Sequence, residues 1–438
     1  MYKILLGISV LVLGIAAVFF LPNLRQPKEE KPSEPIAHYE VAPGYNFRVK
    51  VFAENLGQIT RIKITPDGNT MLVSTLAENI YAFRKNEQGE FVKQDTPFFS
   101  LKTGLPGFPP EESGLSGMVL GADFDGSTGS PSDRRDIFLL HTAVAGEEIL
   151  KNRITRITFT EKPEGVFGEN PVQIFEGNTD SELSHQIQGG VGLMIQEKPH
   201  LLFNIGDAVN AKQSHDLSKE AGKVMLIQRD GSAPLGPRPY PRFPKVQAIG
   251  LRNAFDIAVN PFDPLKRFAI GDTGTDRFDR FLYGKVIDLD GKKQNPIDLR
   301  WDGSNESLEK EVPDTNTKGA PDMALHRWDP TETLDDVVFY SGGTGGIPGS
   351  NASTSYILLA LWGKTGSTEL TPGKAVKLGV LTGFDAQPTL ELRDFIRRAP
   401  AGEGKMGHPL GVGVDPKTKI IYFGDILEGR IYKVEPLP

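Results

Sequence analysis

The chain has 438 residues, of which 38% are apolar and 24% are charged, and its 49 Lys and Arg against 56 Asp and Glu give a net charge of −7. This balance gives no electrostatic support to a general nucleic-acid-binding role. Because the sequence contains no cysteine, it excludes a disulfide scaffold, a thiolate zinc site, a cysteine nucleophile and a lipid-modified cysteine anchor. With 48 Gly and 33 Pro, the composition is typical of a loop-rich globular protein.

The first 22 residues are dominated by one apolar segment. An uncharged run over residues 4–21 reaches roughly 27 Å at about 1.5 Å per residue, just enough to cross the hydrocarbon core of a bilayer. The bulky sequence Phe19-Phe20-Leu21-Pro22 stands where signal cleavage needs small residues. We therefore expect residues 1–22 to form an uncleaved membrane anchor rather than a cleaved signal. A buried core helix is the remaining alternative.

Residues 23–43 lack large apolar side chains over their first half, which is rich in Pro, Lys and Glu. This composition predicts an extended linker. The expected arrangement is a domain over residues 44–438 that an N-terminal transmembrane helix holds outside the cytoplasm, in the periplasmic or extracellular space. If residues 1–22 are cleaved, the protein is instead secreted.

Short apolar strands separated by turns rich in Asp, Pro, Gly and Lys recur through the rest of the chain. Their first strands start about 60 to 80 residues apart, which predicts an all-β, six-bladed β-propeller of four-stranded antiparallel blades over residues 44–438. The six first strands are Ile59–Ile64, Met118–Phe124, Val191–Ile195, Phe255–Val259, Val337–Tyr340 and Gly411–Val414. The segment Asn46–Val51 stands outside the first unit and is expected to close the ring as the outer strand of the last blade. A pair of large β-sandwiches is the alternative.

The second strand of three units ends in an apolar residue followed by Gly-Asp. The three acids are Asp207, Asp272 and Asp425. Equivalent loops of different blades converge at one mouth of a propeller, where ligands bind. The alternative is that each Asp caps its own turn through the backbone.

Two polar segments directly precede predicted inner strands. His185 lies in a Gly-rich turn ahead of Val191–Ile195, where an imidazole is suited to general-base catalysis at neutral pH. Arg252 and Asn253 precede Phe255–Val259, and the arginine offers a charged fork for carboxylates. The alternative for Arg252 is a structural role, binding loop carbonyls.

The loop over residues 272–279 is rich in acids and contains a glycine. Such loops offer the carboxylate and carbonyl oxygens that Ca²⁺ prefers, although the spacing does not match an EF-hand. The sequence also contains neither a G-x-S-x-G nucleophile elbow nor a P-loop.

The order of several segments resembles the glucose/sorbosone dehydrogenases, which include the soluble PQQ-dependent aldose sugar dehydrogenases. The resemblance runs from about residue 45 to about residue 435 and is most specific in the Gly-Lys-Val…Asp-Gly-Ser segment and in Gly-Leu-Arg-Asn. The segments that carry it are the Gly-Leu segment near 114–117, the His185 turn, residues 222–234, residues 250–253, the acidic loop, residues 356–364 and the Gly-His-Pro strand at 407–416.

The resemblance implies a propeller that binds pyrroloquinoline quinone (PQQ) and Ca²⁺ on its top face. His185 is then the general base that takes the proton from the C1 hydroxyl of a sugar while hydride passes to the quinone. Arg252 lies beside the reactive carbonyl, and the main-chain oxygens of Gly274 and Thr275 coordinate the calcium. Cofactor contacts are implied for Asn253, Asp256, Lys364, Asp207 and His408. The expected partners are a small sugar and an unidentified electron acceptor.

The sequence departs from the family's pattern at several of these positions, which are Ser184, Ala208, Asp256, Thr273 and His408. The departures at 208, 256, 273 and 408 keep a second function open, a catalytically silent propeller that binds carbohydrate or protein at the same face. A third alternative is a Ca²⁺-dependent hydrolase such as a lactonase, which needs a cage of carboxylates in the central channel.

Overall fold

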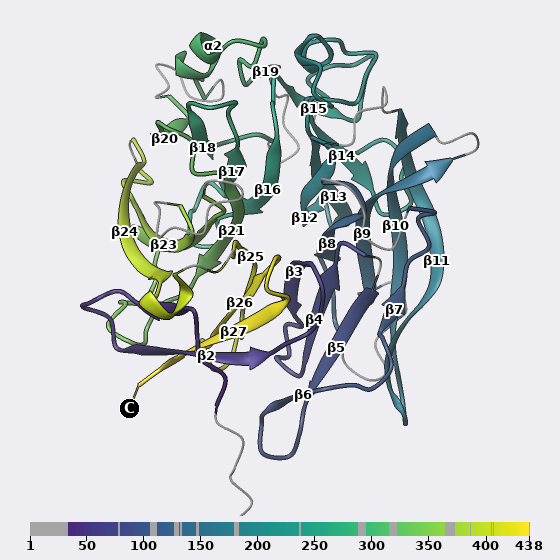
Figure 1. Ribbon diagram of the computed structural model, residues 1–438. Coiled ribbons are helices and arrows are strands. Elements are labelled where there is room, and N and C mark those ends of the chain that lie inside the picture. The colour runs from purple at the N-terminus through teal and green to yellow at the C-terminus, as the bar shows by residue number, and fades with distance from the viewer. Residues whose placement is uncertain are drawn as a thin grey trace, which may run out of the picture. The chain divides into compact units, whose positions relative to one another are not determined.

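Six sheets, one for each predicted unit, are arranged around a common centre (Figure 1). The computed structural model describes residues 34–438, except for 78, 106–111, 127–130, 132–133, 146–148, 179–183, 236–237, 288–294, 315–321, 364–372, 386, 404, 406 and 438. Residues 37–438 form one unit, and residues 1–36 form a separate one. The predicted anchor lies outside the described residues. In the part of the chain that is described, no helix has the length and apolar character needed to cross a membrane.

The first three blades follow the chain in order. The first contains β3 (Ile59–Ile64), β4 (Thr70–Thr75), β5 (Asn79–Lys85), β6 (Phe91–Lys93) and β7 (Phe99–Ser100). The second contains β8 (Leu115–Leu120), β9 (Asp136–Ala145), β10 (Ile149–Lys162) and β11 (Gly165–Asn178). The third contains β12 (Ile187–Ile195), β13 (Lys198–Ile205), β14 (Lys223–Gln228), β15 (Val246–Ile249) and β19 (Ile297–Asp298).

The last three blades bring the N-terminal strands back to the C-terminus. The fourth contains β16 (Ala254–Val259), β17 (Phe268–Asp272), β18 (Asp279–Gly284) and β20 (Ala324–Trp328). The fifth contains β21 (Leu334–Tyr340), β22 (Thr354–Leu361), β23 (Ala375–Thr382), β24 (Thr389–Arg398) and β1 (Tyr39–Val41). The sixth contains β25 (Pro409–Val414), β26 (Ile421–Asp425), β27 (Arg430–Pro436) and β2 (Phe47–Ala53). Short helices are η2 (Ala211–Ser214), α2 (Asn305–Glu309) and η3 (Pro400–Gly402).

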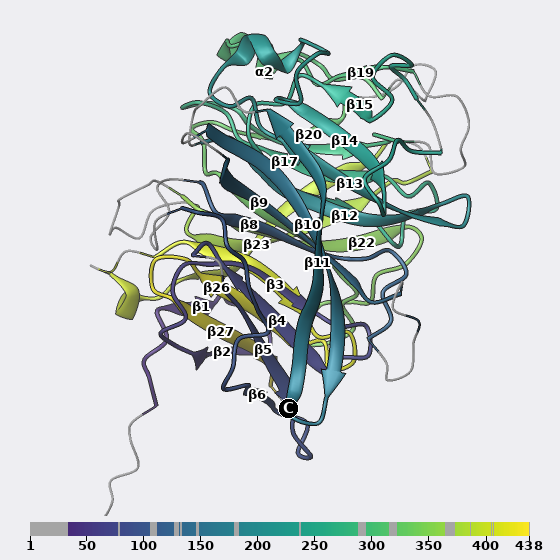
Figure 2. The same cartoon turned by 90° about the vertical axis from the view of Figure 1, so that its right-hand side faces the viewer.

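The predicted all-β, six-bladed propeller is confirmed. Each blade has a four-stranded antiparallel core, and β7, β19 and β1 add a fifth strand to three of them. The inner strands β3, β8, β12, β16, β21 and β25 each contact the next, and β25 contacts β3, so the ring is complete. Figure 2 shows the stacked sheets from the side of β10 and β11.

The ring closes through the strand that the sequence places outside the first unit. β2 pairs antiparallel with β27, with Val49 opposite Val434. One segment of the predicted linker also joins the propeller, because β1 pairs with β24 and the Tyr39 hydroxyl donates to Asp425 at 2.7 Å. The propeller unit therefore begins before residue 44, at residue 37.

Each inner strand carries a register shift near its first residues, at the same end of all six blades. The shifts lie at 59/61, 115/117, 187/190, 254/256, 334/336 and 410/412. A bulge leaves a residue outside the regular pairing and re-aims its side chain. At two of these bulges the freed hydroxyl reaches the next blade: Thr60 donates to the Leu115 carbonyl at 2.9 Å, and Ser116 donates to the Ile187 carbonyl at 2.5 Å. These two bulges therefore link the first three blades to one another at that end of the ring.

We expect Phe47→Ala to destabilise the ring closure. Phe47 begins β2, is 5% exposed, and packs edge-on against Phe395 of the fifth blade at 5.4 Å, so its loss leaves a cavity between two blades. Truncation of such a side chain costs about 3–5 kcal/mol. Urea unfolding measures this loss, and Arg48→Ala is the control, because the Arg48 side chain is 52% exposed in the same strand. Equal unfolding midpoints for the two variants would contradict this role of β2.

Candidate active site

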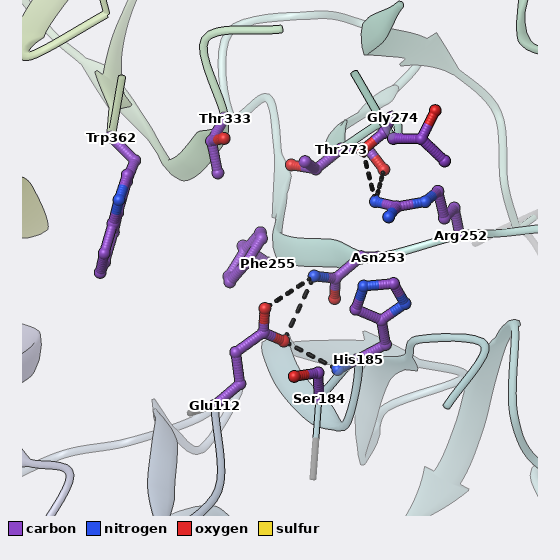
Figure 3. Close-up of a pocket in the computed structure, with 11 residues that line it drawn as sticks. Glu112, Ser184, His185, Arg252, Asn253, Phe255, Thr273, Gly274, Thr333 and Trp362 are labelled. Atoms are coloured by element: carbon purple, nitrogen blue, oxygen red, sulfur yellow. Dashed lines mark hydrogen bonds between the residues drawn. The ribbon is translucent and has the colours of Figure 1, made fainter. Parts of the chain in front are cut away.

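A cavity of about 360 Å³ lies at the end of the propeller where the inner strands begin. Its described lining comes from four blades: from the loops that precede β8, β12, β16 and β21, from those that follow β17 and β22, and from Phe255 in β16. The lining residues are Glu112, Ser184, His185, Arg252, Asn253, Phe255, Thr273, Gly274, Thr275, Thr333 and Trp362 (Figure 3). The ring thus brings together residues that are up to 250 positions apart in sequence.

His185 is held in one orientation by a buried carboxylate. Its Nδ1 lies 2.6 Å from Oδ1 of Asp207, and the other oxygen of Asp207 accepts a hydrogen bond from Trp301 Nε1 at 2.6 Å. Because an ionised carboxylate only accepts, Nδ1 carries the proton and Nε2 is left as the basic nitrogen. Nε2 has no hydrogen-bond partner among the described residues, so it is free to accept a proton from a ligand in the cavity.

The backbone around this pair is strained. His185, Ala208 and Val209 have φ angles of 57°, 51° and 56°, each of which costs a non-glycine residue about 1–3 kcal/mol. Gly206 makes the arrangement possible, since a Cβ there would lie 2.6 Å from the His185 carbonyl oxygen. The strand-end Gly-Asp of this blade therefore has two functions: the glycine admits the His185 turn, and the aspartate binds its imidazole.

Of the other two Gly-Asp segments, only the one at Asp425 fits the alternative of an aspartate that caps its own turn. Asp272 accepts from the backbone N–H groups of Arg252 and Asn253 at 3.1 and 3.0 Å and forms a buried ion pair with Arg280. Asp425 accepts from the N–H groups of its own turn and from Tyr39. Asp207 and Asp272 therefore both hold residues that line the cavity, Asp207 at the imidazole of His185 and Asp272 at the backbone of Arg252 and Asn253.

Arg252 points its guanidinium at backbone carbonyls of the acidic loop. Its Nη1 donates to the Thr273 carbonyl at 2.9 Å and to the Gly274 carbonyl, and its Cζ lies 5.7 Å from the centre of the Trp301 ring. The carbonyl-binding alternative therefore describes Arg252 in this structure. Since Arg252 also lines the cavity, the same side chain is close enough to contact a ligand.

The calcium site implied by the resemblance does not fit this arrangement. The positive guanidinium of Arg252 already donates to the Gly274 carbonyl, one of the two expected ligands. A Ca²⁺ ion bound to the same carbonyl would be repelled by this guanidinium, because both are positive. Thr275, the other expected ligand residue, also lines the cavity, and its hydroxyl lies 2.8 Å from Asp276 Oδ1 and 2.6 Å from Asn305 Oδ1. Over the described part of the chain, no group of three His, Asp or Glu side chains is placed to hold a metal ion. Calcium therefore enters no step of the function proposed below.

Glu112 is a site residue that the sequence analysis missed. Its carboxylate accepts from the backbone N–H of His185 at 2.8 Å and from Asn253 Nδ2 at 3.1 Å (Figure 3). It also accepts from Gln188 Nε2 at 2.7 Å. It therefore joins the His185 turn to the Arg252-Asn253 turn across two blades. Its side chain also places one negative charge in the cavity, opposite in sign to Arg252.

Three of the residues predicted to contact the cofactor do not line the cavity. Asp207 lies behind His185, and Asp256 is 3% exposed beside the carboxylate of Asp336. His408 is buried behind Trp362, where its ring stacks on the indole. Lys364 lies outside the described residues.

Burial and the neighbouring Asp336 raise the pKa of Asp256 from 3.8 to about 8, so Asp256 is protonated at neutral pH. Burial likewise lowers the pKa of His408 from 6.5 to about 4. Asp256 therefore adds no negative charge near the cavity, and His408 adds no positive charge at neutral pH.

Fold and site together define a six-bladed propeller with a histidine–aspartate pair and an arginine in one end cavity. Residues 56–344 match the family model described as Glucose / Sorbosone dehydrogenase. Because this match covers more than half of the chain, the protein belongs to the glucose/sorbosone dehydrogenase family, as the sequence resemblance predicted. No curated protein matches the sequence.

Solved structures share the fold at low sequence identity. The apo-form of the soluble aldose sugar dehydrogenase from Escherichia coli aligns with a TM-score of 0.60 and 14% identity over 89% of this chain and 100% of that chain. The PQQ-bound form of the aldose sugar dehydrogenase from Streptomyces coelicolor aligns with a TM-score of 0.56 and 18% identity over 90% of this chain and 99% of that chain. A calcium structure of a Trichoderma reesei carbohydrate-active enzyme of family AA12 aligns with a TM-score of 0.56 and 13% identity over 93% of this chain and 98% of that chain.

We expect the stability of the protein to fall as the pH rises through about 8, the pKa of Asp256 in the folded state. A carboxyl group with a raised pKa binds its proton more tightly when folded, so its contribution is complete below its usual pKa and is lost as the proton leaves. Asp256→Asn keeps a neutral side chain of the same shape and should flatten this fall. Chemical unfolding from about pH 6 to about pH 9 measures the effect. The exposed Asp394→Asn is the control, and parallel pH curves for the wild type and Asp256→Asn would rule out the assignment.

We expect Ca²⁺ alone to show little binding to the wild-type protein in titration calorimetry, because Arg252 already contacts the loop carbonyls. Arg252→Gln removes the charge and should strengthen Ca²⁺ binding at least about tenfold, a change of about 1.4 kcal/mol. Arg277→Gln in the same loop is the control, because Arg277 forms an exposed pair with Asp329. Tight Ca²⁺ binding by the wild type would show that Arg252 does not exclude the ion.

Proposed function

We propose that the protein is a PQQ-dependent dehydrogenase that oxidises an aldose sugar or a related polyol or aldehyde. The observation that carries the proposal is the His185–Asp207 pair with Nε2 free, in a cavity that also contains Arg252 and Asn253. Family membership supports this class of reaction, and the fold is shared with structures described as aldose sugar dehydrogenases.

The aromatic and hydrogen-bonding groups of the cavity fit a planar ring system that carries oxygen atoms. Trp362 and Phe255 provide aromatic surface, and Arg252 and Asn253 provide donors for carboxylate or carbonyl oxygens. We infer that these four residues hold PQQ. When bound, PQQ supplies a two-electron acceptor for the hydride that leaves the substrate carbon.

The protein's own residues handle the proton. His185 Nε2 accepts the proton of the substrate hydroxyl as its C–H bond breaks, and the resulting imidazolium is stabilised by Asp207 at Nδ1. Trp301 in turn fixes the carboxylate of Asp207. Glu112 binds the backbone N–H of His185, which holds the strained turn that presents the imidazole to the cavity.

His185→Ala should lower kcat by at least about 100-fold, the usual contribution of a general base. Asp207→Asn should lower kcat by at least about tenfold, because an amide can stabilise the wrong imidazole tautomer. Both variants should bind PQQ within about threefold of the wild type, which amounts to less than about 0.7 kcal/mol. Sugar-dependent dye reduction measures kcat, and calorimetry measures the affinity for PQQ.

His215→Ala is the matched control, because the His215 side chain is 36% exposed and pairs with Asp298 outside the cavity lining. Activity in His185→Ala equal to that of this control would overturn the mechanism. A wild-type protein that binds no PQQ would favour the alternative of a catalytically silent propeller, for which the negative charge of Glu112 in the cavity is the supporting observation.

Membrane anchoring through residues 4–21, with the propeller outside the cytoplasm, remains a proposal based on sequence alone. If the proposal is correct, the full chain should sediment with membranes. A chain that begins at residue 37 should remain folded and should not sediment with them. Protease protection of the propeller in cells whose outer barrier has been removed would contradict only the proposed side of the membrane. Full-length protein in the soluble fraction would contradict the anchor.

A further inference from the structure

Trp362 stands at the wall of the cavity opposite Arg252 (Figure 3). It follows β22 directly and is half-buried, and Figure 3 shows its indole nearly edge-on, with one face directed across the cavity toward Phe255. Phe255 is itself the residue freed by the bulge between Ala254 and Asp256. Two aromatic side chains from different blades therefore border the same space.

The other face of the indole is covered by His408. The two ring centres are 4.3 Å apart and the planes differ by 15°, which is a parallel stack. Nδ1 of His408 donates to the carbonyl oxygen of Trp362 at 2.6 Å, so the histidine is bonded to the backbone of the residue on which it stacks. This double contact fixes the plane of the indole and leaves only its cavity face for a ligand.

The charges in the cavity do not by themselves select an anionic ligand. Among the described lining residues, Glu112 is negative and Arg252 is positive, and Arg252 already donates to two carbonyls. His408 is buried and neutral, so it adds no positive charge behind the indole. A planar ligand must therefore gain much of its affinity from contact with flat aromatic surface, and stacking of a heteroaromatic ring on such a side chain contributes about 1–3 kcal/mol.

We propose that the indole of Trp362 is the platform on which the planar ring system of PQQ stacks, and that His408 is the positioning residue that fixes this platform. The inference rests on the proposed function and deepens it. A flat heteroaromatic ligand matches the arrangement better than a puckered sugar, because Phe255 offers a second ring across the same space.

The test uses the full chain and PQQ as the probe, with tryptophan fluorescence and calorimetry as readouts. The protein has three tryptophans, at positions 301, 328 and 362. PQQ should quench the emission of the wild type, and Trp362→Phe should lose most of that quenching. Trp328→Phe should keep it, because Trp328 packs edge-to-face against His326 and is not part of the cavity lining.

The affinities separate stacking from mere proximity. Trp362→Leu should weaken PQQ binding about tenfold, whereas Trp362→Phe, which keeps a ring, should stay within about threefold. His408→Leu removes the aromatic stack and the hydrogen bond and should weaken PQQ binding about threefold to tenfold. His408→Phe, which keeps a stacked ring, should restore most of the affinity.

Each contrary result has a distinct meaning. PQQ affinity in Trp362→Leu equal to that of the wild type, or quenching that persists in Trp362→Phe, would overturn the platform while leaving the proposed function intact. Quenching by glucose alone that Trp362→Phe abolishes would assign the platform to the sugar instead and would also overturn the inference. A wild type that binds no PQQ at all would remove the proposed function together with this inference.

Discussion

Pairing of β2 with β27 is the constraint on which the site depends. This one antiparallel pairing joins residues 47–53 to residues 430–436 and completes the sixth blade, so that β25 can pack against β3. Tyr39 strengthens the junction, since β1 lies on the fifth blade while the Tyr39 hydroxyl reaches Asp425 of the sixth. In an open ring, Glu112 of the second blade and Trp362 of the fifth would have no fixed separation, and neither the cavity nor its opposing walls would be defined.

The architecture was readable from the sequence because a propeller repeats one local pattern. Short apolar strands and their turns mark each blade without any knowledge of distant contacts, and the unpaired segment at Asn46–Val51 indicated the closing strand. The position of His185 ahead of an inner strand could likewise be predicted from the local sequence. The blade pattern therefore predicts at which end of the ring a given side chain lies.

The pattern does not predict which side chains at that end reach the cavity. Asp256 and Phe255 are neighbours, yet the bulge directs Phe255 to the cavity and leaves Asp256 beside Asp336. Glu112 and Trp362 lie at blade ends with no local sign of function, and their importance arises from partners 73 and 46 residues away. Such contacts depend on the closed ring, so a single sequence read locally cannot specify them.

The His185 turn depends both on its local sequence and on contacts between blades. Locally, Gly206 and Asp207 form the same kind of strand end as those at Asp272, which binds the backbone of the Arg252 turn, and at Asp425, which caps its own turn. What distinguishes the third blade is that a second chain segment, the His185 turn, approaches so closely that only glycine fits at 206.

Two carboxylates then hold that turn from opposite sides, Asp207 at the imidazole and Glu112 at the backbone N–H. A strained backbone persists only where its surroundings over-determine it. Because one carboxylate comes from the same blade and the other from the preceding blade, the geometry of the proposed base is set by the packing between blades as well as by its own loop.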